Sequence, residues 1–388
     1  MRLRKLWIIA HRWLGLTVGL LFVLIGLTGS ILVFDHAIDE WLNPELLLTE
    51  KSGETQPVAN IIAAAEAGYA GGGESALSLS KPRVKNGVWS VWFSSGTEEA
   101  PSFTAVHVDP YTANVTGERV WGEYLMSWIY RLHFRLVAGV TGGIIVGVVG
   151  IMMLISVCSG ILLWWPLFKN GWRAAFAIRT GSRFNYDLHK TIGIAASGLL
   201  LILAFTGIYM EFPQTFNAAI EAIAETTESP EDLKTRAPKS SITYSPDEAI
   251  VIAQKLYPDA RFDHMHPLNE HGVYEVAFRQ EHEVQTTFGR TQVFVDGHTG
   301  EVLATYTPED FTAADVFRIW QFPLHSGEAF GLFGRLVVFL TGLTPAVLYV
   351  TGCLLWWRRR KPRNTTQKTS RTGKQDDNKK IRPVQTCS

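Results

Sequence analysis

Cysteine is scarce in this chain of 388 residues, which contains only three. Cys158 and Cys353 lie in long apolar runs and Cys387 lies near the carboxyl terminus, so the long polar segments of the chain have none. This absence excludes a disulfide framework or a thiolate metal site in those segments. The formal net charge is zero, so the total by itself says nothing about partners. We expect no nucleic acid partner.

Motifs of several common enzyme classes are also absent from the sequence. No glycine loop for phosphate opens a helix after a strand, and neither a serine nucleophile elbow nor the histidine pair of a zinc protease is present. The tail after Arg363 is polar, is predicted to be disordered, and is too short for a nucleotide or flavin domain.

What the sequence has instead is four long apolar runs. Each can cross a membrane as a helix, which takes about 20 residues, and none has a charge in its central part. The runs are Leu6–Phe34, Leu136–Trp165, Leu188–Phe212 and Phe333–Trp357. The first is too long for the apolar part of a signal peptide and has no small-x-small cleavage site before Asp35, so we interpret it as an uncleaved anchor.

The placement of basic residues predicts the orientation of these helices. Lysine and arginine gather before the first run, between the second and the third, and after the fourth. They include Arg2, Arg4, Lys5, Lys169, Arg173, Arg179, Arg183, Arg358, Arg359, Arg360, Lys361 and Arg363. Segments rich in these residues stay in the cytoplasm, so both termini are expected inside and the two long polar segments outside.

The chain also repeats itself. His189 lies 178 residues after His11 and His325 lies 192 residues after His133, and several glycines, threonines and tryptophans match at the same two offsets. Such register predicts a duplicated unit, which is parallel because both copies start inside. We therefore predict a membrane all-α four-helix bundle with two outside α+β domains. The expected division is membrane helices at 1–35, 131–166, 188–212 and 326–357, outside domains at 36–130 and 213–325, a cytoplasmic loop at 167–187 and a disordered tail at 358–388.

Each outside domain is predicted to hold a helix followed by strands. The expected helices are Val58–Tyr69 and the segment from a capping box at Ser245 to Leu256, and the expected strands are Val88–Phe93, Phe103–Val108, Val273–Arg279 and Gln292–Val295. The turns after the last strands contain Asp109 and Asp296, whose carboxylates can accept hydrogen bonds from turn amides. Residues 228–241, rich in proline, serine and charge, are predicted to be a surface linker.

Four histidines carry the predicted chemistry. His11 and His189 lie at the cytoplasmic helix ends and His133 and His325 at the outer ends, so the repeat pairs them by depth. One imidazole from each side can bind the iron of a haem placed between facing helices, which predicts two haem sites. The alternative interpretation is that these histidines are interfacial anchors or ordinary packed residues. Their repetition favours the haem sites.

Cationic side chains near the two pairs are candidates for binding the haem propionates. They are Arg12 and Lys190 near the inner pair, and Arg131, Arg135 and Arg335 near the outer pair. The outer arginines run against the positive-inside trend, which favours a functional role for them, whereas topology alone explains the inner cations.

Other histidines lie outside these two pairs, and His36 has no partner in the repeat, which places Gln214 opposite it. His36 follows the first run and is a candidate for facing substrate. His264, His266, His271 and His282, in the second outside domain, could bind a metal because alternate residues of a strand share a face. The alternative is a solvated surface, and the lack of cysteine or of a close carboxylate pattern favours this alternative over a metal site.

Several motifs extend over nearly the whole chain. They are His11-Arg12-Trp13-Leu14-Gly15, Leu132-His133, Asp187-Leu188-His189-Lys190, Leu324-His325-Ser326-Gly327, the Gly-x-Leu-Leu-Trp-Trp helix ends at 160–165 and 352–357, and the Val-Asp-x-x-Thr turns. By these motifs the sequence resembles the PepSY-associated transmembrane family, and within it the haem-containing ferrisiderophore reductases of bacterial inner membranes. The first outside domain departs from the family pattern at Ala113-Asn114, where Gly-Glu is usual.

The resemblance implies an iron-regulated inner-membrane protein with periplasmic domains that reduces Fe(III) in a siderophore to Fe(II). Two haem b groups would carry the electrons, which a quinol or a cytoplasmic flavoprotein would supply, and lipid would surround the helices. Hard oxygen ligands hold Fe(II) far less tightly than Fe(III), so reduction would release the iron.

Two further hypotheses stay open at this point. One is a permease, or a permease accessory, for iron compounds, although the paired polar residues expected in the middle of its helices are lacking. The other is a membrane-anchored PepSY module that binds or inhibits a partner and needs no haem.

Overall fold

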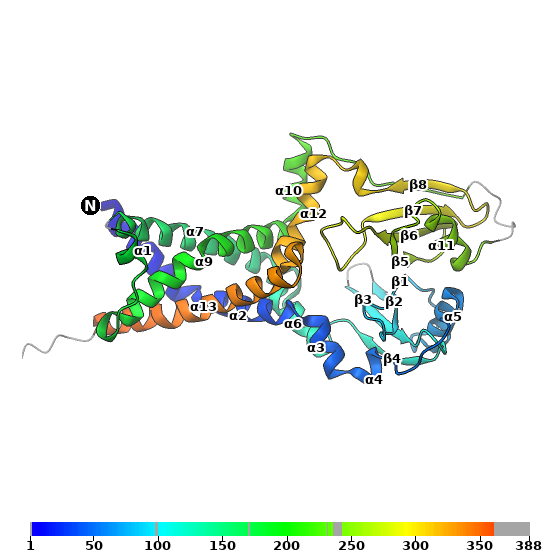
Figure 1. Cartoon of the computed structure of the whole chain (residues 1–388), viewed down its shortest axis with the longest axis horizontal. Coiled ribbons are helices and arrows are strands. Elements are labelled where there is room, and N and C mark those ends of the chain that lie inside the picture. Colours follow the sequence, from blue (N-terminus) through cyan, green and yellow to red (C-terminus); the bar gives the residue numbers. More distant parts are fainter. Residues whose placement is uncertain (1, 98–99, 170, 231, 236–242, 361–388) are drawn as a thin grey trace, which may run out of the picture.

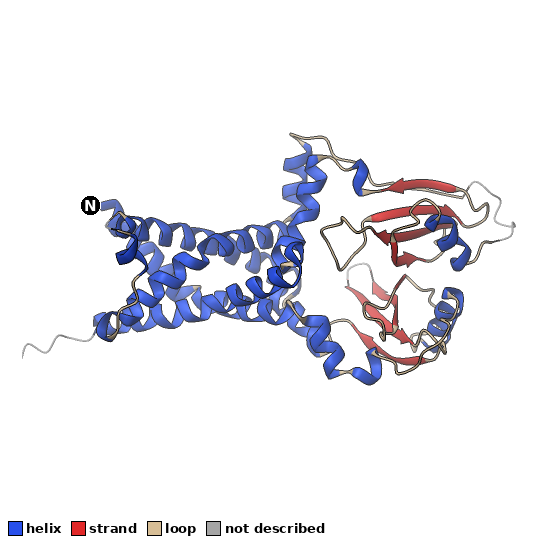
Figure 2. Cartoon of the chain, in the orientation of Figure 1, coloured by secondary structure: helices blue, strands red, loops and turns tan. Residues whose placement is uncertain are grey.

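The computed structural model describes residues 2–97, 100–169, 171–230, 232–235 and 243–360. It consists of a long helical region and an antiparallel sheet region at one end of it (Figures 1 and 2). We call the helix ends next to the sheet the sheet end, and the opposite ends the far end. Part of the predicted linker at 228–241, and all of the tail after Arg363, lie outside the described residues.

The helical region contains the candidate membrane spans. Among the described residues, three helices are long and apolar enough to cross a membrane: α7 (Gly139–Phe168), α9 (Phe184–Glu211) and α13 (Gly331–Arg360). The pair α1 (Arg2–Thr17) and α2 (Gly19–Leu32) meets the same criteria together and makes a fourth span if it is counted as one. The helix α9 packs against α7 and α13, while α1 packs against α7 and α2 against α13.

The first span is bent, which the uniformly apolar sequence did not predict. The axes of α1 and α2 differ by 59°. Two contacts lie at the break. The Thr17 hydroxyl donates to the carbonyl of Trp13 at 2.7 Å, a back-bond that bends helices. The ring of Tyr349, from α13, lies so close to Gly19 that a Cβ there would meet it at 2.5 Å.

Short separate helices precede α7 and α13 at the sheet end. The expected span at 131–166 is divided into α6 (Leu125–Arg135) and α7, because Leu136 and Val137 adopt positive φ angles of 49° and 55°. The helix α12 (Ala313–Ser326) and the short η3 (Glu328–Phe330) likewise precede α13. His133 and His325 therefore lie on α6 and α12 and not on the long spans.

The two expected outside domains join into one sheet. In the described residues eight strands follow the order β4-β3-β2-β1-β5-β6-β7-β8, and all neighbours are antiparallel. The strands are β1 (Ser78–Ser80), β2 (Trp89–Thr97), β3 (Ala100–Val108), β4 (Val115–Val120), β5 (Arg261–His266), β6 (Val273–Arg279), β7 (Thr291–Asp296) and β8 (Val302–Tyr306). The pairing of β1 with β5 makes the two halves continuous, a contact that the sequence did not predict.

Two helices, one from each half, pack on the sheet over a shared core. They are α5 (Val58–Gly68) and α11 (Pro246–Gln254), and the apolar side chains of Ile61, Leu79 and Met265 are fully buried in the core. The predicted capping box at Ser245 is confirmed. Further helices connect the two regions or lie at the far end: α3 (Asp35–Leu42), α4 (Pro44–Leu47), α8 (Trp172–Phe176), η1 (Gly181–Arg183), α10 (Pro213–Glu221) and η2 (Pro308–Asp310).

Candidate functional site

The far end brings His11 of α1 and His189 of α9 together. Their ring centroids are 6.2 Å apart and their planes are nearly perpendicular, at 89°. The Nδ1 atom of His11 lies 3.0 Å from the carbonyl of Ser156 and 2.9 Å from the hydroxyl of Ser159, both on α7. The Nδ1 atom of His189 lies 2.9 Å from the hydroxyl of Thr351 on α13.

The sheet end repeats this arrangement with His133 of α6 and His325 of α12. Their centroids are 6.1 Å apart and their planes meet at 59°. His133 Nδ1 lies 3.0 Å from the carbonyl of Ile25 and 3.1 Å from the hydroxyl of Thr28, both on α2. His325 Nδ1 lies 2.8 Å from the hydroxyl of Thr206 on α9. Each histidine of both pairs is thus hydrogen-bonded to a neighbouring helix through Nδ1 and a Ser or Thr hydroxyl.

A glycine follows each of these hydroxyl residues and gives the imidazole room. A Cβ placed on it would meet the ring at 2.8 Å for Gly29 against His133, 3.3 Å for Gly207 against His325, 3.3 Å for Gly160 against His11, and 3.6 Å for Gly352 against His189. Thr28-Gly29 and Thr206-Gly207 are 178 residues apart, and Ser159-Gly160 and Thr351-Gly352 are 192 apart. The same hydroxyl-glycine pair therefore positions all four rings.

The hydrogen bonds determine which ring nitrogen is free. A carbonyl oxygen only accepts, so Nδ1 of His11 and of His133 carries the proton and donates. The Thr351 hydroxyl donates its proton to the carbonyl of Val347, so it accepts a hydrogen bond from Nδ1 of His189. The Thr206 hydroxyl likewise donates to the carbonyl of Ile202 and accepts from Nδ1 of His325. In the described part of the chain no hydrogen bond engages Nε2 of these four histidines, and its lone pair stays available.

The centroid distances match those of two imidazoles that bind one metal ion between them. Two imidazoles on opposite sides of one ion hold their centroids about 6 Å apart, because each metal–nitrogen bond takes about 2 Å and each centroid lies about 1 Å beyond its nitrogen. Both ring planes contain the bond axis and can rotate around it, so the two interplanar angles are equally compatible. The donor set, neutral imidazole on both sides, is the one that haem iron accepts.

The comparison with known families agrees with the membrane character of the helical region. The family model described as the PepSY-associated TM region matches residues 8–359. The chain belongs to this family. The match includes all four paired histidines and the whole described sheet. A search of the curated proteins finds no match.

The cations that were candidates for the haem propionates have different surroundings in this PepSY-associated protein. Lys190 is buried, and its ammonium donates to the carbonyls of Ala174 and Ala177 and to Asp187, so it holds the connection between α7 and α9. Arg12 is half-buried, and its Nε has no hydrogen-bond partner among the described residues. Arg12 is therefore the better placed of the two candidates at the far end.

At the sheet end the three candidate arginines lie near the start of α7 and α13. Arg131 extends over Gly122, and the Arg135 guanidinium lies 5.1 Å from the ring centroid of Phe134. Arg335 lies 4.0 Å from the buried carboxylate of Glu328. His36, the substrate candidate, is exposed on α3 with its imidazole 3.6 Å from Asp35.

A basic pocket lies in the sheet region, lined by residues of β5, β6 and neighbouring loops. Its volume is about 230 Å³, and its lining includes the cations Lys81, Arg83, Arg261 and Arg279 and a single carboxylate, Asp263. Such an excess of positive charge suits an anionic ligand. Thr286 and Thr287 also line this pocket, and both donate hydrogen bonds to Glu328, which is three residues after His325. Glu328 thus connects one side of the pocket to the chain segment that follows His325.

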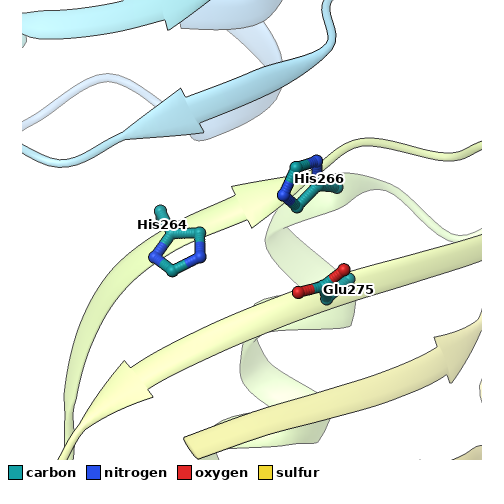
Figure 3. A group of neighbouring side chains, drawn as sticks. All are labelled: His264, His266 and Glu275. Atoms are coloured by element: carbon teal, nitrogen blue, oxygen red, sulfur yellow. The ribbon is translucent and has the colours of Figure 1, made fainter. Parts of the chain in front are cut away.

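Two of the four histidines considered as metal ligands in the second half of the sheet lie together. His264 and His266 converge with Glu275 (Figure 3). The imidazoles of His271 and His282 instead lie 3.7 Å and 3.6 Å from the carboxylates of Glu270 and Glu309. The Asp109 and Asp296 turns have the predicted hydrogen bonds from their amides. The sequence did not reveal the role of Ser159 and Thr351, although they match at the same offset of 192, because that role depends on contacts with histidines of other helices.

Proposed function

We propose that this protein is a di-haem b-type electron-transfer protein that reduces a ferric siderophore, Fe(III) to Fe(II), at the face that carries the sheet. The observation that supports this most is that two imidazoles face each other at each end of the helical region. Their ring centroids are 6.2 Å apart at the far end and 6.1 Å apart at the sheet end. Haem bound there would supply a one-electron Fe(III)/Fe(II) couple. The chain itself would bind and orient the haem groups and separate them from water.

The contacts of each imidazole are those that such a ligand requires. The Nδ1–H donation to a carbonyl or hydroxyl orients the ring, fixes Nε2 as the unprotonated nitrogen, and raises its basicity. The neighbouring glycine allows the ring to lie against the helix backbone. Since the same contacts recur at both offsets, they also support the proposal of a parallel duplication and a four-helix bundle.

The proposed orientation places the sheet in the periplasm of a bacterial cell and both termini in the cytoplasm. The far end carries Arg358, Arg359 and Arg360 at the last turn of α13, and the α7–α9 connection at the same end is also basic. A quinol or a cytoplasmic flavoprotein would supply the electrons. The four cations of the basic pocket favour a negatively charged chelate as the acceptor.

A single-turnover experiment tests the reaction. The purified full chain is reduced with dithionite, excess reductant is removed without oxygen, and an anionic ferric chelate is added with a chromophore that traps Fe(II). We expect reoxidation of the haem spectrum and an equal amount of trapped Fe(II), and His133→Ala should abolish both. A reduced protein that keeps its spectrum in the presence of the chelate would refute the proposal. Uptake of the intact chelate into liposomes without reductant would favour a permease.

A further inference from the structure

Three potential metal ligands converge on the sheet, apart from the paired histidines of the helices. His264 and His266 lie on β5 and Glu275 on β6, and their ligand atoms all lie within 4.8 Å of one another (Figure 3). Alternate residues of a strand share a face, and Glu275 is the direct cross-strand partner of His266. The neighbour Met265 points the other way, into the core. The three side chains thus share one face of the sheet.

Both imidazoles have their proton on the nitrogen that points away from the cluster. His264 Nδ1 lies 2.9 Å from the carboxylate of Asp263, and His266 Nδ1 lies 3.0 Å from the carbonyl of Leu77. A carboxylate and a carbonyl oxygen can only accept hydrogen bonds, so Nδ1–H of each histidine donates and Nε2 of each has a free lone pair. Hydrogen bonds of this kind, from a ligand imidazole to a carboxylate or a carbonyl, are typical of metal sites.

The Nε2 atom of His264 is the strongest indication of a missing ligand. The side chain of His264 is only 4% exposed and packs on Phe288, with 4.0 Å between ring centroids. Its Nε2 is buried and has no hydrogen-bond partner among the described residues. Buried polar atoms are nearly always paired in folded proteins, so this lone pair requires a partner.

The third ligand is held in a similar way. One carboxylate oxygen of Glu275 accepts a hydrogen bond of 2.6 Å from the amide of Gln292, which leaves the second oxygen for a metal. His266 and Glu275 are half-buried and leave a route into the site from solvent. Asp263, the partner of His264, also lines the basic pocket, so the cluster lies directly beside the proposed chelate site.

We propose that His264, His266 and Glu275 bind one divalent first-row transition-metal ion. Two imidazoles and one carboxylate suit Fe²⁺ and Zn²⁺ and leave further positions open for water or for a ligand of the chelate, whereas Ca²⁺ and Mg²⁺ prefer oxygen alone. Metal bonds of about 2.1 Å require the ligand atoms to approach within about 3.4 Å in a tetrahedral site, so small side-chain rotations close the cluster on the ion.

The position beside the basic pocket identifies the cargo as Fe²⁺ left by reduction of the chelate, a part of the inference that rests on the proposed function. No electron transfer takes place at this site. It binds the ion that the chelate no longer holds tightly, and so separates the product from the empty chelator.

Equilibrium binding to the tag-free full chain in detergent, without oxygen, tests the site with Zn²⁺ and with Fe²⁺ as probes. We expect one ion per chain in addition to any haem iron. His266→Ala and Glu275→Gln should lower the affinity at least about tenfold. His271→Ala and His282→Ala, in the same half of the sheet, are matched controls that should not change it. Glu275→Gln is the deciding variant, because it keeps the shape of the side chain and leaves the packing on Phe288 intact.

Two outcomes overturn the site: no ion bound by the wild-type protein, or an affinity that both ligand variants leave unchanged. The proposed function can fail separately. If the ion binds but the chelate is not reduced, the metal site stands and the assignment of Fe²⁺ as its cargo falls. If the chelate is reduced but no ion binds, the metal site alone is refuted.

Discussion

A single methyl group at Gly29 should remove the haem at the sheet end. The Cβ of an alanine there would lie 2.8 Å from Cε1 of His133. Carbon atoms in contact need about 3.5 Å, so the ring must retreat by about 0.7 Å. Metal–ligand distances hold within about 0.2 Å, so a shift of this size would break the proposed bond between His133 and the haem iron.

The other glycines provide a graded series of controls. Gly207→Ala places its methyl 3.3 Å from the equivalent ring of His325 and should weaken haem binding only partly, while Gly352→Ala, at 3.6 Å from His189, should leave the far-end haem in place. Gly198 is exposed on α9 with nothing near its Cβ position, so Gly198→Ala should have no effect on haem. Alanine is favoured over glycine in helices by about 1 kcal/mol, so these variants should still fold.

Reduced-minus-oxidised absorption spectra with a haem-to-protein ratio measure this series. We expect about one haem per chain in Gly29→Ala and about two in Gly198→Ala and Gly352→Ala, with chain folding checked by circular dichroism. A Gly29→Ala protein that keeps the full haem content and an unchanged low-spin spectrum would show that His133 does not bind iron from this position.

Three further predictions concern other contacts. Thr206→Val removes the hydroxyl that accepts from His325 and should lower haem affinity at the sheet end by about 10- to 100-fold in a haem titration, whereas Thr206→Ser should retain it; equal affinities would exclude this role. Arg83→Gln should raise the KM for an anionic ferric chelate but not for a neutral one, and the effect should shrink at high salt. Burial raises the pKa of Asp109, but the hydrogen bonds from Thr49 and the turn amides together lower it by more than burial raises it. The pKa of Asp109 therefore lies below its usual value. The Asp109 carboxylate therefore contributes to stability above about pH 4, and this contribution is lost as the pH falls. Asp109→Asn should lower the free energy of unfolding by about 1–3 kcal/mol at pH 7 but by much less at pH 3. Thermal unfolding at the two pH values measures this difference.

The two pairs of histidines could be predicted from the sequence because the chain repeats. The offsets of 178 and 192 residues match His11 with His189 and His133 with His325, and equivalent positions of a repeat occupy equivalent depths. The structure brings each pair to about the same centroid distance. Strand composition similarly located β6 at the predicted range Val273–Arg279, because β-branched and aromatic residues such as its valines, Tyr274 and Phe278 are typical of strands.

Features that depend on distant contacts could not be predicted in this way. The bend between α1 and α2 involves Tyr349, which is more than 300 residues away, and apolarity alone is the same for a straight and a bent span. The strand β1 has only three residues, Ser78–Ser80, too few to show an alternating pattern, yet it joins the two halves of the sheet. The basic pocket likewise draws its cations from two separate parts of the chain.

The candidate metal cluster shows the same limit at the level of one residue. His264 and His266 were recognisable as neighbours on one face of a strand, but the carboxylate that completes the set comes from the next strand. Glu275 looks like an ordinary solvent-facing residue in the sequence, and only the register of β5 with β6 places it beside His266.

The measurement that tests the central claim most directly is the haem content of the purified wild-type chain and of two variants, one from each end. The account predicts a low-spin b-type spectrum with two haems per chain, which falls to one in His133→Ala and to one in His189→Ala. A correctly folded wild-type protein without colour, or variants that both keep two haems, would contradict it.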